Sequence, residues 1–356
     1  MTPSLIPALF LLAPSTGTGG EDPAPGISLT KFLDGVDALR VGGLLRGSAD
    51  KADNELSAVA NEDVQALRLY DAQLWFSAEM AGYEAFVKLD AGEATAFPPI
   101  PDDGVQTVDL RDAWVRKALA ENIQIYVGQY KCPLLASGNV GDGSLAMIDR
   151  TRIGYLFSFP GAYQPGIAVM GDFGPVHLKL SVQNGADSFI DGFGIVARGE
   201  FKVGDGAKQN EGALGADGFN ATFGVGYFTD DSQIAGSDFG SGLAADVYAT
   251  MDALSFHAEV LDADEELASR ALGNTTEDAT AYDATVGFLF SDEIEGFVRY
   301  QNLDNEVDAD IIGAGANYYV SGHALKWQLN ASKYEDDNID GTVFQLGLAI
   351  GHSERY

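Results

Sequence analysis

The chain ends on the stretch Phe344-Gln345-Leu346-Gly347-Leu348-Ala349-Ile350-Gly351-His352-Ser353-Glu354-Arg355-Tyr356. Through Ile350, large apolar side chains occupy every second position, and the positions between them hold small or polar groups. Successive side chains of a β-strand point to opposite faces of the sheet, so this alternation predicts a strand with one oily face and one polar face. A soluble sandwich can use such a strand. A membrane barrel uses it with the oily face toward lipid and the polar face toward its interior.

The same alternation recurs along most of the chain. It predicts strands near residues 37–48, 64–79, 83–93, 106–118, 122–132, 165–173, 176–184, 193–203, 217–228, 241–251, 253–262, 280–291, 293–302, 309–321, 323–334 and 342–356. These ranges make sixteen strands, an even number, as in single-chain outer-membrane barrels of bacteria. Aromatic residues near the predicted strand ends, among them Trp114, Tyr300, Tyr318 and Tyr319, are expected to form girdles at the two membrane interfaces.

The connections between these strands alternate between short turns and long loops, and the segment 204–216 is the one long exception among the short turns. Short periplasmic turns opposite long external loops are the usual asymmetry of outer-membrane barrels. The sequence therefore predicts an all-β fold, a 16-stranded antiparallel transmembrane β-barrel in the outer membrane of a Gram-negative bacterium. An even number of strands places both termini on the periplasmic side.

Composition sets further bounds on the 356 residues. The net charge of −32 argues against nucleic acid as a partner, and the one cysteine, Cys132, excludes an intramolecular disulfide and a multi-cysteine metal site. No run has the roughly 18 to 20 apolar residues of a spanning helix. The apolar stretch 5–13 suits the core of a signal peptide. We expect a signal peptide and disordered segment over 1–26 and the barrel over 27–356. A merely disordered N-terminus stays open, because no Lys or Arg precedes the apolar stretch.

Residue patterns of enzymes and cofactor sites are missing from the sequence. The histidines His177, His257, His323 and His352 lie on separate predicted strands or strand ends, without the short spacing of metal ligands or a nucleophile partner. We predict no enzyme activity, no catalytic residue, no metal site and no cofactor. The acidic stretches 230–238 and 262–266 leave calcium bound in a loop as a weak alternative.

Several stretches resemble the phosphate-selective porin O and P family. They are Val108-Asp109-Leu110-Arg111-Asp112-Ala113-Trp114-Val115, then Ile125-Tyr126-Val127-Gly128-Gln129-Tyr130-Lys131-Cys132-Pro133, then Asp149-Arg150, and later Gly313 to Val320 followed by Leu325 to Ser332. The resemblance implies a homotrimeric barrel whose third long loop folds into the lumen, narrows it and sets selectivity. Here that loop is 133–164, with Ser137, Asn139, Asp142, Asp149 and Arg150 as candidate constriction residues.

The chain departs from the family where the family is basic. The first half of the long loop contains no Lys or Arg, and Asp71, Gln73 and Tyr126 stand at predicted wall positions. These departures indicate reduced basicity of the lumen. If the oily faces point to lipid, the pore-lining candidates are Arg40, Arg46, Asp71, Gln73, Lys88, Asp90, Arg116, Tyr126, Arg299 and Lys326. Opposed basic and acidic rows would create a transverse field in the lumen. They could equally neutralise one another and support the wall.

The function predicted from these observations is a porin for passive diffusion of hydrated ions and small polar solutes, with outer-membrane lipid around it. The alternatives are a plugged structural or binding barrel without transport, an outer-membrane barrel enzyme, and a secreted soluble β protein. The preferred solute, the sign of ion selectivity and the pore diameter do not follow from the sequence.

Overall fold

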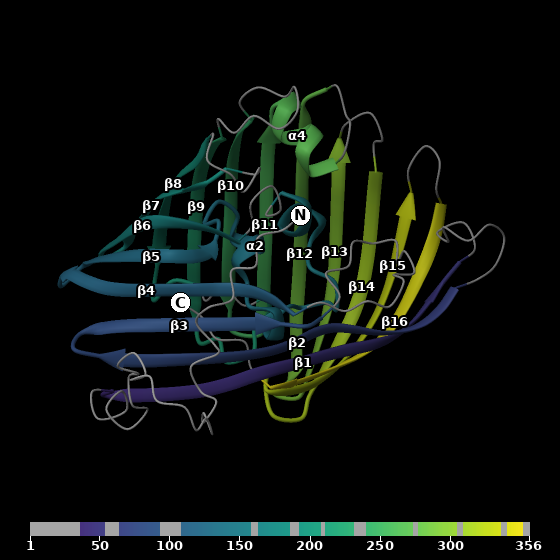
Figure 1. The fold of residues 1–356 in the computed structure, drawn as a ribbon. Helices are drawn as coiled ribbons and strands as arrows, with labels where there is room; N and C mark the ends of the chain where they lie inside the picture. The colour runs from purple at the N-terminus through teal and green to yellow at the C-terminus, as the bar shows by residue number, and fades with distance from the viewer. Residues whose placement is uncertain are drawn as a thin grey trace, which may run out of the picture.

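The strands of the chain form one wall around a central space, as the computed structural model in Figure 1 shows. The structure describes residues 36–53, 64–92, 108–157, 163–185, 192–207, 211–230, 240–272, 277–304, 309–335 and 340–351. The predicted signal segment 1–26 and the terminal Tyr356 lie outside these described residues.

Sixteen antiparallel strands make up the wall, each paired with its neighbours in sequence. Their bounds are β1 (Ala38–Ala52), β2 (Val64–Met80), β3 (Tyr83–Asp90), β4 (Asp109–Ala120), β5 (Ile123–Lys131), β6 (Tyr163–Phe173), β7 (Val176–Asn184), β8 (Phe193–Val203), β9 (Phe219–Asp230), β10 (Gly240–Met251), β11 (Leu254–Ala263), β12 (Ala279–Ser291), β13 (Ile294–Asp304), β14 (Ala309–Tyr319), β15 (Leu325–Glu335) and β16 (Asp340–Gly351). The first and last strands also pair, from Leu44 opposite Gly351 to Ala52 opposite Val343. The predicted fold class, a closed barrel of sixteen antiparallel strands, is confirmed.

Side chains alternate between the two faces of the wall. On β16, Phe344, Leu346 and Ile350 are exposed on the outside, whereas Gln345 and Ala349 are buried on the inside. Other strands expose further large apolar side chains, including Val225, Val298, Ile312 and Leu329. An outer face this apolar, on a sheet without unpaired edges, is typical of a barrel that spans a membrane.

A β-bulge between β1 and β2 changes which side chains β2 turns inward. The register places Arg46 opposite Asp71 and Gly47 opposite Leu69, so Tyr70 is the extra residue. As a consequence, the neighbouring side chains of Tyr70 and Asp71 are both buried inside the barrel. Bulges of this kind re-aim side chains without ending the ladder.

The predicted aromatic girdles are only partly correct. Tyr300 and Tyr318 are exposed on the outer face, where an interfacial ring requires them. Trp114 and Tyr319 are buried inside the barrel, with 3% and 2% of their surface exposed. Tyr318 and Tyr319 are consecutive, so the period of two sends one outward and the other inward. Proximity to a strand end does not decide whether a side chain lies on the outer or the inner face of the barrel.

Helices lie in the connections between strands. Helix α4 (Glu265–Leu272) follows β11 at one rim of the barrel (Figure 1). Asp264 precedes it and caps it, because its carboxylate accepts a hydrogen bond of 3.0 Å from the Leu267 backbone N–H. In the part of the chain that the structure describes, no helix has the length and apolarity needed to cross a membrane.

Replacing Leu346 by Arg tests the outward apolar face. Leu346 lies in the middle of β16 with 51% of its surface exposed. A lipid-facing Arg at the midplane of a barrel costs about 2–4 kcal/mol, and one near the interface about 0–1 kcal/mol. We expect this loss in the free energy of unfolding measured in phospholipid vesicles. Leu39→Arg, at the start of β1, is the matched control. Equal losses in both variants would contradict the assigned depth of the two positions.

Candidate functional site

The connection between β5 and β6 turns into the barrel instead of standing outside it. We call it the constriction loop; it covers residues 132–162, of which 132–157 are described. It contains the short helices α2 (Ala136–Asn139), η3 (Asp142–Ser144) and α3 (Arg152–Leu156). Figure 1 shows α2 inside the wall of strands. The predicted inward folding of the third long loop is confirmed.

Apolar packing draws the loop inward. Leu134, Leu135, Ile153 and Phe157 join a buried cluster with wall residues of β8 to β14, so the inner wall carries an apolar patch here. Thr151 starts α3 by accepting a hydrogen bond of 3.2 Å from the Gly154 N–H. Burial of apolar surface stabilises by about 25 cal/mol per Å², and this gain fixes the loop against one side of the barrel.

At β14 and β16, the wall comes close to the loop at two glycines. A Cβ at Gly347 of β16 would lie 2.7 Å from Ile148, and one at Gly313 of β14 would lie 3.0 Å from Met147. A side chain at either position would force the end of the Ile148 or Met147 side chain to shift. The wall is therefore shaped for the segment 145–148.

Basic side chains of the wall hold the loop by its backbone carbonyls. The four contacts are Arg46 Nη1 to Ile148 O at 2.9 Å, Arg198 Nη1 to Leu134 O at 2.9 Å, Arg299 Nη1 to Asp149 O at 2.9 Å, and Lys326 Nζ to Leu145 O at 2.6 Å. Hydrogen bonds from charged donors are about twice as strong as neutral ones. All four cations thus anchor the constriction loop, and three of them, Arg46, Arg299 and Lys326, are among the pore-lining candidates predicted from the sequence.

A second segment enters the barrel from the opposite end. We call residues 204–218, between β8 and β9, the inner turn; its residues 204–207 and 211–218 are described. The Glu211 N–H donates to the Ser144 carbonyl at 3.3 Å, and the Glu211 carboxylate accepts from the Ala146 N–H at 3.0 Å. The same carboxylate pairs with Arg299 at 2.6 Å. The constriction loop and the inner turn therefore meet inside the lumen.

The charge of Glu211 depends on this contact. Burial alone would raise the pKa of its carboxyl, but Arg299 and His257, together with the hydrogen bond from Ala146, hold the pKa below its ordinary value. Glu211 is thus ionised at neutral pH, and its negative charge is balanced by Arg299 where the two segments meet.

Asp142 fixes the tip of the constriction loop on the wall of β2 and β3. Gln73 donates to its carboxylate at 2.7 Å, and Arg150 pairs with it at 2.5 Å. Burial would raise the pKa of Asp142, but Arg150, Lys88 and other nearby cations hold it well below the usual range. Asp142 therefore brings a permanent negative charge into a basic neighbourhood.

The remaining predicted residues lie on the inner wall or in the loop. Three ion pairs lie on the inner wall: Asp71 with Arg46 at 2.5 Å, Asp90 with Arg111 at 3.6 Å, and Lys88 with Asp112 at 3.8 Å. Arg116 forms an ion pair with Glu84 and also donates a hydrogen bond of 2.8 Å to the Tyr126 hydroxyl. Arg40 lies exposed at the rim and pairs with Glu79 at 2.7 Å. In the loop, Asn139 donates to Leu135 O at 2.8 Å, Arg150 donates to Ser137 O at 2.5 Å, and the Asp149 carbonyl accepts from Arg299. Opposite charges thus pair along the wall, and their role in conduction stays a prediction.

Sequence reasoning missed two groups of residues. Glu211 lies in the inner turn, whose exceptional length was the only signal. His257, Glu259 and Asp283 come together on the inner wall of β11 and β12, with candidate metal-binding atoms within 4.8 Å of one another. Their juxtaposition needs the register of two strands, so no local spacing could show it.

The single thiol and one of the acidic stretches have structural explanations. Burial raises the pKa of the Cys132 thiol to about 11, which keeps it un-ionised at neutral pH, as suits a filler of the apolar cluster. Of the two stretches considered for calcium, residues 231–239 lie outside the described residues. In the other stretch, Asp264 caps α4 and accepts from Ser241 N at 2.7 Å.

Replacing Glu211 by Gln tests the contact between the two inward segments. The variant keeps the shape but loses the charge that strengthens the bonds from Ala146 and Arg299. Charge-assisted hydrogen bonds contribute about 1.5–3 kcal/mol against about 1 kcal/mol for neutral ones, so we expect hydrogen exchange at the Ala146 amide to quicken about tenfold or more. Glu84→Gln, which removes a charge paired with Arg116 elsewhere on the wall, is the control. Equal exchange at Ala146 in both variants would disprove the contact.

The pKa directions also predict how this contact responds to pH. Glu211 and Asp142 have lowered pKa values in the fold, so their stabilisation is fully present above the ordinary values of 4.5 and 3.8 and is lost as pH falls through the folded ones. Between pH 7 and about pH 5, protection of the Ala146 amide, corrected for the intrinsic exchange rate, should stay constant. A loss of protection within that window would contradict the assignment.

Comparisons with known proteins show the fold of the chain. No family model and no curated protein matches it. A loop-L8 deletion mutant of OmpT, an outer membrane protein of Vibrio cholerae, is similar with a TM-score of 0.62 at 11% identity, over 88% of this chain and 99% of that one. OmpT of Vibrio cholerae in its trimer form gives a TM-score of 0.60 at 9% identity, over 88% and 99%. The outer membrane channel DcaP of Acinetobacter baumannii gives 0.59 at 14% identity, over 90% and 98%. The chain shares the barrel fold of these proteins, and its resemblance to the phosphate-selective porin O and P family stays a prediction.

Proposed function

We propose that the protein is a bacterial outer-membrane channel through which hydrated ions and small polar solutes diffuse passively. The observation that carries the proposal is a charged interior narrowed by the constriction loop, inside a wall whose outer face is apolar. The similarity to the outer membrane channel DcaP supports it. We also propose that the short turns and both termini of the chain face the periplasm, and that outer-membrane lipid surrounds the wall.

The charges of the interior support a channel of weak selectivity. In the interior, Arg46 pairs with Asp71 and Arg198 with Asp246 on the wall, and Arg299 of the wall pairs with Glu211 of the inner turn. A cation paired with a carboxylate adds little net field at the path of a solute. We therefore expect a weaker preference for phosphate than the resemblance to phosphate-selective porins implies. The trimer form of OmpT supports a homotrimer as the assembly.

One observation favours a second function, a structural or binding barrel without significant transport. The constriction loop meets the inner turn through Glu211 and Ser144 and also reaches β1, β2, β11, β13 and β15. A lumen crossed in this way could be closed to solutes. Conductance separates the two functions, because the barrel and its lipid-facing surface are common to both.

Current through single proteins in a planar bilayer tests the proposal. Under a tenfold KCl gradient we expect a measurable conductance and a small zero-current potential that added phosphate leaves unchanged. A potential of the anion-selective sign, with phosphate blocking the chloride current, would instead support a phosphate channel. Absence of any conductance would favour the structural barrel.

Deleting residues 138–144 tests whether the constriction loop limits the conductance. The segment carries part of α2 and all of η3, together with Asp142 and the Ser144 carbonyl that receives the Glu211 N–H. We expect the variant to fold, because the deletion leaves all sixteen strands intact, and to conduct more than the full chain. The size of this increase in conductance depends on how far the deletion enlarges the narrowest cross-section of the path. An unchanged conductance in a folded variant would mean that the loop does not limit the path.

A further inference from the structure

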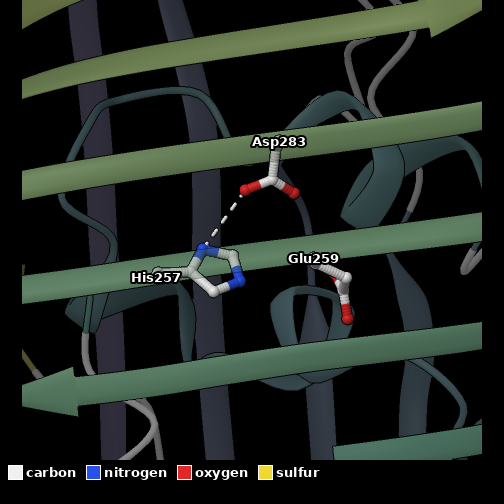
Figure 2. A group of neighbouring side chains, drawn as sticks. All are labelled: His257, Glu259 and Asp283. Carbon is white, nitrogen blue, oxygen red and sulfur yellow. Dashed lines mark ion pairs between the residues drawn. The ribbon is translucent and has the colours of Figure 1, made fainter.

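A buried group of metal-ligating side chains lies on the inner wall of β11 and β12. His257 and Glu259 are two residues apart on β11 and therefore point to the same face. Asp283 of β12 stands opposite Glu259 in the register of the two strands. Figure 2 shows the three side chains converging from the two strands. Each is at most 3% exposed, and their candidate ligand atoms lie within 4.8 Å of one another.

Two of the three side chains have polar atoms that the protein does not satisfy. Neither nitrogen of His257 and neither carboxylate oxygen of Asp283 has a hydrogen-bond partner. The two side chains approach to 3.3 Å between Nδ1 and Oδ1, but without hydrogen-bond geometry. Buried polar atoms are nearly always paired, and an unpaired one costs about 1–3 kcal/mol. Four such atoms on two neighbouring buried side chains point to a missing ligand.

The charge of the group is not balanced either. Glu259 and Asp283 are two carboxylates directly opposite each other, an arrangement that is destabilising unless something lies between them. The nearby arginines are engaged elsewhere, Arg198 with Asp246 and Arg299 with Glu211. Among the described residues, no lysine or arginine forms an ion pair with Glu259 or Asp283. Buried charges require a counter-charge, and a divalent cation would supply it.

We propose that His257, Glu259 and Asp283 bind one divalent transition-metal ion of the zinc type. One imidazole nitrogen and two carboxylate oxygens are a ligand set that suits Zn²⁺ and its neighbours, with a fourth position open to water. Calcium and magnesium prefer sets made of oxygen alone, so the histidine argues against them. The 3.3 Å between His257 and Asp283 matches the spacing of two ligands about 2 Å from one ion.

The surroundings suit such a site. The His257 ring stacks on Tyr248 with 4.1 Å between centroids, which fixes the imidazole plane. A small cavity lined by Glu211, Tyr248, His257 and Thr285 adjoins the group on the side of the inner turn. Its volume of about 10 Å³ is close to the space of one water molecule, which could occupy the open position.

The ion would also act on the constriction loop. Glu259 already accepts a hydrogen bond of 2.8 Å from the Ala136 N–H and another from the Ser137 hydroxyl, both at the start of α2. A metal bound to Glu259 fixes the carboxylate that holds this end of the loop. The proposed site thus joins the wall of β11 and β12 to the base of the loop. It stands whether or not the barrel conducts.

Metal binding to the full chain in detergent tests the proposal. The protein is stripped with EDTA, titrated with Zn²⁺ by calorimetry, and desalted for metal analysis. We expect one tightly held equivalent in the unaltered chain, and binding weaker by on the order of 100-fold in His257→Gln and in Asp283→Asn. His177→Gln, a histidine on β7 outside the group, is the matched control and should bind like the unaltered chain.

Two outcomes would overturn the proposal. One is an unaltered chain that retains no zinc, which would mean that the buried carboxylates are kept neutral by protons. The other is equal zinc binding in all variants, which would place the metal in the acidic loops. Heat-dependent migration in gels verifies that each variant is folded. Asp283→Asn keeps the side-chain shape and removes a buried charge, so it carries the test alone if His257→Gln does not fold.

Discussion

The pairing of β1 with β16 is the constraint on which the rest of this structure depends. An open sheet leaves a row of backbone N–H and C=O groups without partners, which lipid cannot satisfy. Nine residue pairs, from Leu44 with Gly351 to Ala52 with Val343, remove both edges at once. Closure also turns one face of every strand toward the outside of the barrel and the other toward its interior. The apolar side chains of one face then contact lipid, and each charged side chain of the opposite face must find a partner in a confined interior.

The confined interior explains why the loop and the wall are so closely matched. The loop has few side-chain groups of its own that could satisfy its carbonyls, and the wall supplies them from Arg46, Arg198, Arg299 and Lys326. Carboxylates of the wall and of the inner turn form ion pairs with these cations or accept hydrogen bonds from N–H groups of the loop, as Glu259 does from the Ala136 N–H. Charges that would be costly alone are thus stabilised as one network. His257, Glu259 and Asp283 are the place where this network lacks a positive charge.

The sequence predicts the fold far better than the site, for a physical reason. Alternation is a local property, so it reveals sixteen strands and the inward direction of Arg46, Lys88, Arg299 and Lys326. The prediction of aromatic girdles was wrong for Trp114 and Tyr319 because it used their position near a strand end and not the alternation. The site depends on contacts between residues far apart, such as Ile148 with Asn330 at 3.1 Å or Glu211 with Arg299. Register and loop course decide these contacts, and neither is written in any short stretch of the chain.

The close fit of Ile148 against Gly347 has a consequence for how the molecule is assembled. The loop comes from the middle of the chain, but the wall it rests on is formed by the last strands and closes onto the first. Contacts between residues so distant in sequence form late and slowly, because closing the long segment between them costs conformational entropy before the contacts contribute any stabilisation. The interior is therefore completed only after the final strand is in place. A chain interrupted before β16 would be left with an open edge and an unsupported loop.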